Sequence, residues 1–457
     1  MSNIRVGVIG LGVMGASLAQ NLASKGLKVN VYNRTPTKTQ ALLQKGVPNI
    51  EGYSDLATFV NDLTGPKIML LLVKSGRPVD AVIEELRPLL DPADILVDCG
   101  NSNWHDTQRR QKAFQGVVNF VGCGVSGGEE GALRGPSLMP GGKDEVVNER
   151  LLPILRRIAA KDFNGKPCVT NVGRGPAGHF VKMVHNGIEY AMMQGIAEVY
   201  DLLRASGYSN LEMQALFRAC NYGNLQSFLM DITVDILGTR DSLGQGFLVD
   251  RVSDVAKAKG TGGWTVEAGL RFGVALPNIA AAVIARTQSA RNFTFLKNLD
   301  LRGKTSPLKK TAQELQTPLY RALELVYLTS YLQGLDLIRQ ASKELAWEVN
   351  LSEVIRIWQG GCIIRSQMLS TLHLFWEEDN SWKQKLLQEA RVDLDVLRLL
   401  LYKTVTPKPV LHATYDYLQG LFQPTLSSNL IQAQRDYFGA HGYRRVDREG
   451  NFTGGWN

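Results

Sequence analysis

The pattern of hydrophobic positions divides the chain into two regions. Up to about residue 175, short β-branched runs alternate with amphipathic stretches, as strands alternate with helices around a parallel sheet. Beyond about residue 178, the strand pattern disappears and long helical periodicities replace it. We therefore expect an α/β Rossmann-type dinucleotide-binding domain followed by a large all-α domain. The runs that predict strands are Arg5–Ile9, Lys28–Tyr32, Lys67–Val73, Ile95–Asp98, Phe120–Gly124 and Cys168–Asn171.

The same change in hydrophobic pattern sets the expected domain boundaries. We place the dinucleotide-binding domain at residues 1–176 and the helical domain, for substrate binding and dimerisation, at residues 177–434. The remainder, residues 435–457, is an extended C-terminal tail that is rich in glycine and lacks an apolar helical stripe. Its aromatic side chains predict that the tail docks on another surface.

The segment Phe180–Tyr190 carries four polar residues at helical spacing in an otherwise largely apolar sequence. Lys182, His185, Asn186 and Glu189 stand at offsets of zero, three, four and seven, so they share one face of an α-helix. A narrow polar stripe on an apolar helix is typical of a buried cleft, where a base and an acid can serve one substrate. The alternative is that the two charged groups are solvated and the other two satisfy nearby backbone groups.

A weak internal repeat runs through the helical region. Gln194-Gly195 recurs as Gln333-Gly334 in similar surroundings, which fits a duplicated helical unit. The positions that match the two ends of the polar stripe are Arg321 and Leu328 in the second copy. If the repeat is real, only the first copy keeps both the amine and the carboxylic acid.

A glycine motif follows the first predicted strand and precedes a helical pattern. The first glycine of such a loop allows a tight turn, the second lets the backbone approach a pyrophosphate, and the third permits close helix–strand packing. The loop consists of Gly10, Leu11, Gly12, Val13, Met14 and Gly15. We interpret it as the phosphate-binding loop of a dinucleotide site.

The residues at the end of the second predicted strand indicate which dinucleotide the site binds. An NAD site would place an acidic residue there to bind the ribose hydroxyls, whereas this chain has Asn33, Arg34 and Thr35. Arg34 can pair with a 2′-phosphate, which a carboxylate would repel. The pattern favours NADP, with an ordinary polar turn as the alternative.

Composition narrows the classes of partner. The net charge of +8 over 457 residues suggests an anionic partner, but the basic residues are dispersed, so small anions fit better than nucleic acid. Five scattered cysteines and six histidines without paired spacing argue against a metal site and for a reducing, cytoplasmic location. No apolar run approaches the roughly 18 residues that span a bilayer, and we expect neither a membrane segment nor a signal peptide.

Taken together, these motifs resemble the 6-phosphogluconate dehydrogenase family, the decarboxylating enzymes of the pentose phosphate route within the β-hydroxyacid dehydrogenase superfamily. The resemblance covers nearly the whole chain. It implies oxidation of 6-phospho-D-gluconate by NADP⁺ with loss of CO₂, giving D-ribulose 5-phosphate. Besides the glycine loop and the polar stripe, it is carried by Leu72–Gly76, Asp98–Ser102, Gly124–Gly131, Gly135–Gly142, Lys259–Gly262, Gly361–Ser366 and Arg435–His441.

The resemblance also implies roles for single residues. Lys182 is similar to the family's general base at the 3-hydroxyl, and Glu189 to the acid that protonates C1 of the enediol. Beyond the glycine loop and Asn33 to Thr35, the implied cofactor contacts are Val73, Lys74 and Asn101. The implied substrate contacts are Asn101, Ser126, Gly127, Gly128, His185, Asn186, Tyr190, Lys259, Thr261, Arg286, Arg435 and His441.

In the family, the last two of these residues come from the partner subunit, whose tail threads into its neighbour. The resemblance therefore implies a homodimer with tail exchange. Departures from the family pattern occur at Cys99, Ala191, Met192 and Gln359, and none removes a proposed catalytic group. The alternatives are another β-hydroxyacid dehydrogenase acting on a related hydroxy acid, or a catalytically inactive NADP(H)-binding relative.

Overall fold

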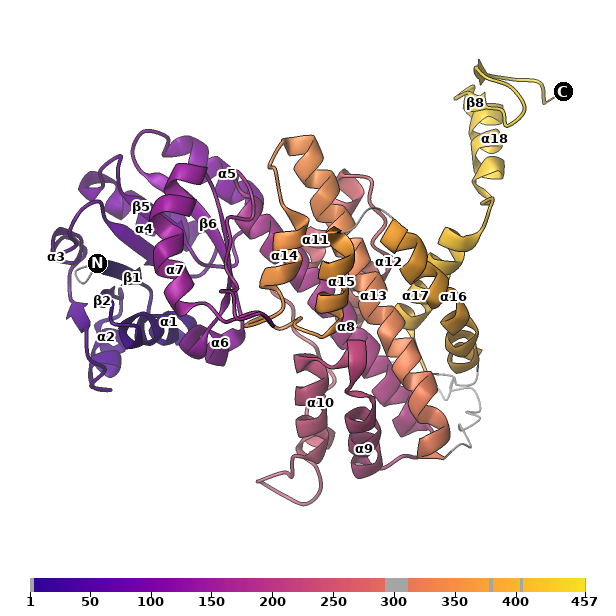
Figure 1. Cartoon of the computed structure of the whole chain (residues 1–457), viewed down its shortest axis with the longest axis horizontal. Coiled ribbons are helices and arrows are strands. Elements are labelled where there is room, and N and C mark those ends of the chain that lie inside the picture. The colour runs from indigo at the N-terminus through magenta and orange to yellow at the C-terminus, as the bar shows by residue number, and fades with distance from the viewer. Residues whose placement is uncertain (1–3, 292–310, 378–380, 403–405, 457) are drawn as a thin grey trace. The chain divides into compact units, whose positions relative to one another are not determined.

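The computed structural model describes residues 4–291, 311–377, 381–402 and 406–456 (Figure 1). The chain forms two compact units, residues 1–414 and residues 415–457. Among the described helices, none is long and apolar enough to cross a membrane.

The first unit begins with a seven-stranded sheet in the order β3-β2-β1-β4-β5-β6-β7. Strands β1 to β6 pair in parallel, and β7 runs antiparallel to β6. The strand order changes direction between β1 and β4, and ligands of open α/β sheets bind at the carboxyl ends of the strands beside such a point. The strands are Arg5–Ile9 (β1), Lys28–Tyr32 (β2), Ile50–Tyr53 (β3), Ile68–Leu71 (β4), Ile95–Asp98 (β5), Asn119–Ser126 (β6) and Ser137–Gly141 (β7).

Helices cover both faces of this sheet, so it has two separate apolar cores. Val6, Val8 and Val97 belong to one core, and Ile9 and Leu96 to the other, because successive strand residues point to opposite faces. The covering helices are Val13–Ser24 (α1), Pro36–Leu43 (α2), Leu56–Asn61 (α3), Arg77–Leu86 (α4), Trp104–Ala113 (α5), Gly128–Arg134 (α6) and Leu152–Ile158 (α7). The expected doubly covered α/β architecture is confirmed.

The sheet differs from the sequence prediction in three strands. Cys168–Asn171 is not a strand, since Val169 makes only an isolated bridge to Leu138. The edge strands β3 and β7 were not predicted. β3 is short and half-exposed, and β7 contains Pro140, which strands tolerate at a sheet edge but which hides their pattern.

The helical region is built on two long helices that lie side by side, Ala177–Ala205 (α8) and Ala312–Leu345 (α13) (Figure 1). The other helices of the region are Asn210–Cys220 (α9), Phe228–Gly238 (α10), Thr261–Arg271 (α11), Pro277–Ser289 (α12), Leu351–Ile357 (α14), Met368–Glu377 (α15), Ser381–Tyr402 (α16) and Pro409–Phe422 (α17). The large helical region after the sheet is thereby confirmed.

The two glycines of the internal repeat both lie where α8 and α13 approach each other. A Cβ atom on Gly195 would come within 2.7 Å of Val326, and one on Gly334 within 2.5 Å of Ile188. This reciprocal contact supports the duplicated helical unit, which stays a prediction.

A second correspondence concerns the first turns of α12 and α17. Gln333 of α13 accepts a hydrogen bond from the backbone of Asn278 at 3.1 Å, and Glu198 of α8 accepts from Val410 and Leu411 at 2.9 Å. Each long helix therefore accepts hydrogen bonds from free backbone N–H groups in the first turn of another helix.

The second unit contains the end of α17, the helix Ser428–Gly439 (α18) and a pair of two-residue strands, Tyr443–Arg444 (β8) and Asn451–Phe452 (β9). Asp436 organises it, because its carboxylate accepts hydrogen bonds from Gly442, Thr453, Gly454 and Trp456 at 2.7–2.8 Å. Burial acts to raise the pKa of Asp436, but these donors hold it at about 2. The expected tail boundary at residue 435 falls inside α18, and the three-part division stays a prediction.

Candidate functional site

Glycines place the first turns of α8 directly against the backbone of β6 and β7. A Cβ atom on Gly178 would overlap the carbonyl oxygens of Gly122 and Met139, and one on Gly124 would overlap the Cβ atom of Lys182. Helix and sheet therefore touch without intervening side chains. This contact puts the polar stripe of α8 at the carboxyl end of β6.

The polar stripe of α8 is a buried, hydrogen-bonded cluster. Lys182 is only 6% exposed, and its Nζ donates to Asn186 Oδ1 at 2.8 Å and lies 3.3 Å from His185 Nδ1. Glu189 completes the face, with Oε2 3.9 Å from the same ring nitrogen and a side chain that is 22% exposed. The sequence alternative of a solvated lysine is thus wrong, and the acid is the member nearest to solvent.

Burial favours the uncharged form of each titratable group in the cluster. It lowers the pKa of Lys182, against the opposing effect of Glu189, and raises the pKa of Glu189 against the effects of Lys182 and Arg286. Burial, and then the neighbouring Lys182, hold the pKa of His185 well below its ordinary value. A neutral lysine is a base, and a protonated glutamic acid is a proton donor, which are the forms that proton transfer at neutral pH needs.

His185 connects the cluster to the loop after β6. Its Nε2 lies 3.0 Å from the hydroxyl of Ser126, which also accepts from the backbone of Ile363 at 3.4 Å. The other ring nitrogen, Nδ1, lies 3.3 Å from Nζ of Lys182 and 3.2 Å from the acceptor Oδ1 of Asn186. His185 thus links the amine and the amide of α8 to the Ser126 hydroxyl.

A third segment at the site was not assigned a role from the sequence. Trp358 lies edge-on to His185 at 5.9 Å between ring centroids, and the buried Cys362 is close enough to affect the pKa of Lys182. Burial raises the pKa of the Cys362 thiol to about 12, so the thiol is neutral. The sequence did flag Gly361–Ser366 as a family motif, but its contribution is a backbone N–H and apolar surface, which carry no signature of chemistry.

At the other end of the stripe, α11 and α12 converge on Tyr190. A Cβ atom on Gly262 would come within 2.7 Å of the Tyr190 ring, so the start of α11, with the buried Thr261, lies against it. The guanidinium carbon of Arg286, from α12, lies 3.4 Å from the centre of the same ring. Lys259 is exposed in the segment that leads into α11. The structure thus brings Tyr190, Thr261 and Arg286 together at the Glu189 end of α8.

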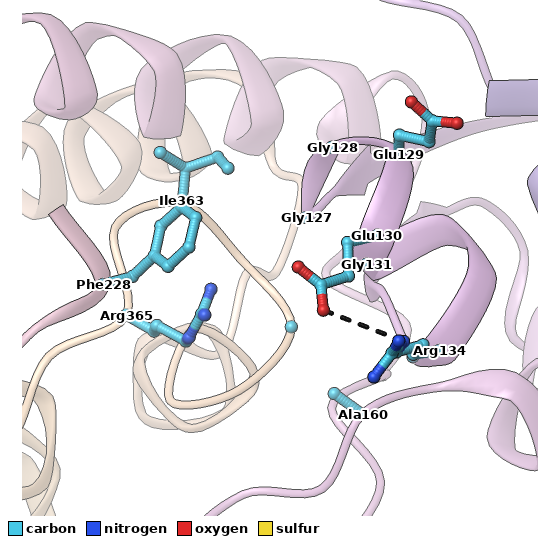
Figure 2. A pocket seen from close by; sticks show the side chains of 12 residues that line it. Gly127, Gly128, Glu129, Glu130, Gly131, Arg134, Ala160, Phe228, Ile363 and Arg365 are labelled. Atoms are coloured by element: carbon cyan, nitrogen blue, oxygen red, sulfur yellow. Dashed lines mark ion pairs between the residues drawn. The ribbon is translucent and has the colours of Figure 1, made fainter. Parts of the chain in front are cut away.

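A pocket of about 440 Å³ opens beside the Gly127–Gly128 loop (Figure 2). Figure 2 shows Phe228, Ile363 and Arg365 on one side of it and the loop with Glu130 and Arg134 on the other. The Arg365 guanidinium stacks on the Phe228 ring at 3.9 Å, and Glu130 pairs with Arg134 at 3.7 Å. Ile363 lines this pocket and hydrogen-bonds Ser126, so the pocket adjoins the loop that the resemblance assigns to substrate.

The matching face of α13 has no comparable cluster. Arg321 there pairs with Glu324 at 2.8 Å and lies 3.6 Å from Asp393, and these side chains with Leu328 line a pocket of only about 110 Å³. Its cation is therefore neutralised by neighbouring carboxylates. Among the residues that the structure describes, only the first copy of the proposed repeat places an amine and a carboxylic acid on one helix face.

The glycine loop has the geometry that a dinucleotide requires. Gly10 has φ +96°, and a Cβ atom on it would lie 2.6 Å from the carbonyl oxygen of Leu72. A Cβ atom on Gly15 would overlap the carbonyl oxygen of Gly10, whereas one on Gly12 would enter open space. That space lies at the N-terminus of α1, whose free N–H groups suit a pyrophosphate. The residues present fit NADP.

The residues at the end of β2 divide into two roles. Asn33 Oδ1 accepts from the backbone of Leu11 at 2.8 Å, so this side chain ties the glycine loop to β2. Arg34 and Thr35 are exposed beside it. Val13, Lys74 and Asn101 are also exposed, on the loop itself and at the ends of β4 and β5, and Met14 and Val73 are half-buried.

Arg34→Ala is expected to raise the Kd for NADP⁺ by about tenfold or more, with little change for NAD⁺, because only NADP⁺ carries the 2′-phosphate. Titration calorimetry with each cofactor measures both constants. Lys45→Ala, an exposed lysine just beyond the other end of helix α2, serves as the control. Equal losses for the two cofactors in Arg34→Ala would show that Arg34 does not read the 2′-phosphate.

Arg435 and His441 lie in the second unit. Both are exposed, and Arg435 donates to Gln432 at 3.2 Å. The expectation that they meet the substrate of a partner subunit stays a prediction.

Comparison with known proteins agrees with this architecture along the whole chain. Residues 5–173 match the family model of the NAD binding domain of 6-phosphogluconate dehydrogenase, and residues 178–456 match that of its C-terminal domain. The decarboxylating 6-phosphogluconate dehydrogenase of Lactococcus lactis subsp. cremoris is 42% identical over 100% of this chain and 99% of its own length. That of Synechococcus elongatus is 44% identical, with 98% of each chain covered.

Solved structures give the same result. The 6-phosphogluconate dehydrogenase of Plasmodium falciparum, studied with its cofactor NADP⁺ and its substrate 6-phosphogluconate, is 36% identical with a TM-score of 0.92, covering 99% of this chain and 100% of that one. A 3-hydroxyisobutyrate dehydrogenase from Salmonella typhimurium is 19% identical with a TM-score of 0.50 over 63% of this chain and 94% of its own, a likeness of fold alone.

The glycine loop at the first strand–helix turn and the polar cluster beside the carboxyl end of β6 define a Rossmann-type dinucleotide-binding protein with a helical second domain. Within that class, the chain belongs to the 6-phosphogluconate dehydrogenase family. The resemblance seen in its motifs is confirmed.

Proposed function

We propose that the protein catalyses the oxidative decarboxylation of 6-phospho-D-gluconate by NADP⁺ to D-ribulose 5-phosphate and CO₂. The observation that carries this proposal is the buried amine of Lys182, hydrogen-bonded to Asn186 and two helical turns before Glu189, at the end of a sheet that bears a dinucleotide loop. NADP⁺, bound at that loop, supplies the hydride acceptor. We also propose a cytoplasmic location, which fits five free cysteines.

Lys182 serves in two steps. As the neutral amine, it accepts the proton of the substrate's 3-hydroxyl while the hydride leaves C3, and a β-keto acid results. When the bond to the carboxylate breaks, its electron pair moves toward the ketone oxygen and CO₂ departs. The ammonium group that Lys182 has become then stabilises the enolate oxygen. Asn186, which already accepts from Nζ, orients the amine in both steps.

Glu189 completes the reaction at the other end of the stripe. Its carboxyl donates a proton to C1 of the enediol, which restores a carbonyl and gives the ketose. Burial raises the pKa of Glu189, so the group retains the proton that this step consumes. Ser126, held by His185, binds the substrate's oxygens together with the loop that contains Gly127 and Gly128.

The phosphate of the substrate requires cations. Thr261 and Arg286 are already placed near Tyr190, and Lys259 leads into the same region. Directed hydrogen bonds from an arginine suit a phosphate dianion. We propose that Arg435 and His441 of a partner subunit complete this group of cations, so that the active form is a homodimer with exchanged tails.

Mixing two inactive variants tests the shared site. In a heterodimer of Lys182→Ala and Arg435→Ala, one of the two sites would hold both native residues. Unfolding and refolding an equimolar mixture is therefore expected to restore about a quarter of the wild-type activity, whereas each variant alone stays nearly inactive. Lys182→Ala mixed with Lys182→Arg is the control, which regains nothing. A mixture no more active than its parts would place Arg435 in the site of its own chain.

The reaction itself is tested by supplying 6-phosphogluconate with NADP⁺ or NAD⁺ and following reduced cofactor and released CO₂ together. The proposal requires one CO₂ for each NADPH. NADPH without CO₂ would indicate a non-decarboxylating β-hydroxyacid dehydrogenase. Cofactor binding without turnover would indicate an inactive relative.

A further inference from the structure

Arg110 is a fully buried arginine on α5 whose charge the mechanism does not use. Its guanidinium contacts two segments, residues 76–80 and residues 98–102. Nε donates to Asp80 at 2.8 Å, Nη2 donates to the carbonyl of Gly76 at 3.0 Å, and Nη1 lies 3.4 Å from both Asp98 and Ser102. A buried charge is costly unless paired, so this one is held by a dedicated set of partners.

One of these segments is the turn after β5, which carries Asn101. The turn folds around the carboxylate of Asp98, since Oδ1 accepts from the backbone of Gly100 at 3.0 Å and Oδ2 accepts from the Ser102 hydroxyl at 2.6 Å. Asp98 and Ser102 are buried, while Asn101 between them is exposed. The shape of the turn therefore depends on the Asp98 side chain, and Arg110 pairs with its Oδ2.

The second segment is the loop after β4, which carries Val73 and Lys74 and ends at Gly76. Strands β4 and β5 are neighbours in the sheet, so their two loops leave it side by side. Arg110 holds one loop by the Gly76 carbonyl and the other by Asp98 and Ser102. One planar group thus sets the spacing of the two loops that bear Val73, Lys74 and Asn101.

Helix α5 also contacts α8. The hydroxyl of Thr107, one turn before Arg110, lies 2.6 Å from Nδ1 of the buried His179, one turn before Lys182. This contact fixes the position of α5, which carries Arg110, relative to α8, which carries Lys182.

We propose that Arg110 is a positioning residue that holds the loops after β4 and β5 at the separation required by NADP⁺ and so aligns the cofactor with Lys182. The inference rests on the proposed function for the identity of the cofactor. A lysine could not replace Arg110, because an ammonium group is a point charge, whereas the guanidinium fork meets partners in three directions.

The neighbouring Arg109 offers a matched control. It also pairs with Asp80, at 2.9 Å, and with Asp106 at 3.4 Å, but its side chain is 55% exposed. Arg109→Lys and Arg110→Lys make the same chemical change on adjacent residues that share one partner.

The experiment compares Arg110→Lys, Ser102→Ala and Arg109→Lys with the wild type. Calorimetry gives the Kd for NADP⁺, thermal unfolding gives Tm, and steady-state kinetics gives the KM for each substrate. We expect Arg110→Lys to raise the Kd by about tenfold, as the loss of hydrogen bonds to charged groups implies, and Ser102→Ala to raise it by less. The KM for 6-phosphogluconate is expected to change less than that for NADP⁺, and Arg109→Lys to match the wild type.

Two results would overturn the proposal. One is an unchanged Kd for NADP⁺ in both Arg110→Lys and Ser102→Ala. The other is a fall in Tm with equal losses for both substrates, which would make Arg110 merely structural. If Arg110→Lys does not fold, Ser102→Ala decides the matter alone. Since NADP⁺ binding is measured without turnover, failure of the proposed reaction would leave this test intact.

Discussion

Replacing Lys182 with alanine is expected to lower kcat for 6-phosphogluconate by about 10³-fold, within the range for loss of a general base. The Kd for NADP⁺ is expected to stay nearly constant, because Lys182 lies on α8 and the glycine loop precedes α1. The effect is large because the same group accepts a proton in the oxidation and stabilises the enolate in the decarboxylation. Stopped-flow and steady-state measurements of NADPH formation, with calorimetry for the cofactor, give the two quantities.

Lys182→Arg tests the role of the amine as a base while a positive charge is kept at the position. Arginine keeps a positive charge but does not lose its proton in proteins, so it cannot act as the base. We expect this variant to be as inactive in the oxidation as Lys182→Ala. Substantial turnover by either variant would contradict the assignment. In the wild type, activity is expected to fall as pH drops through the lowered pKa of Lys182, because protonation removes the base.

Glu189→Gln is expected to slow the overall reaction by about 10²-fold or more, since glutamine cannot deliver a proton to C1. In D₂O, the wild type is expected to place one solvent deuterium at C1 of the product with a single stereochemistry. The variant is expected to lose that selectivity, because the enediol is then protonated from solvent. Product NMR measures it, and retention of full rate and selectivity would remove Glu189 from this role.

Glu189→Gln also tests the raised pKa of Glu189 through thermal stability, without measuring turnover. Burial raises the pKa of Glu189, so the native state binds its proton more tightly than the unfolded chain does. The stabilising effect of that proton is present below the unfolded pKa and is lost as pH rises through the folded pKa. Glu189→Gln is therefore expected to raise Tm relative to the wild type near neutral pH but not in acid. An equal difference at both pH values would contradict the burial argument.

Periodicity was enough to place four polar side chains on one face of α8, although it left a solvated stripe open as the alternative. Four polar residues at helical offsets, flanked by apolar ones, predicted a buried stripe, and Lys182 and His185 are buried. The glycine loop could also be predicted from the sequence, because each of its three glycines has a separate steric reason. Asn33 was predicted to contact the cofactor. Its hydrogen bond to the backbone of Leu11 could not be predicted, since an amide at the end of a strand can face either a loop or a ligand.

Other parts of the site were outside the reach of such patterns. Ile363 contributes a backbone N–H, and Cys362 a buried neutral thiol, so neither has a spacing or a charge that marks it. Arg110 was given no role from the sequence, because its partners Gly76, Asp98 and Ser102 lie on other segments and form no motif with it. Strand β7 was missed since Pro140 and Gly141 hide its alternation.

The contact between α8 and the sheet has a consequence for altering this protein. Gly124 and Gly178 meet their neighbours with no space for even one methyl group, so α8 can neither turn about its axis nor slide along β6. The absence of side chains at Gly124 and Gly178 therefore fixes where the Lys182 side chain leaves α8. Moving the base of this side chain would therefore require changes in β6 and β7 as well as in α8.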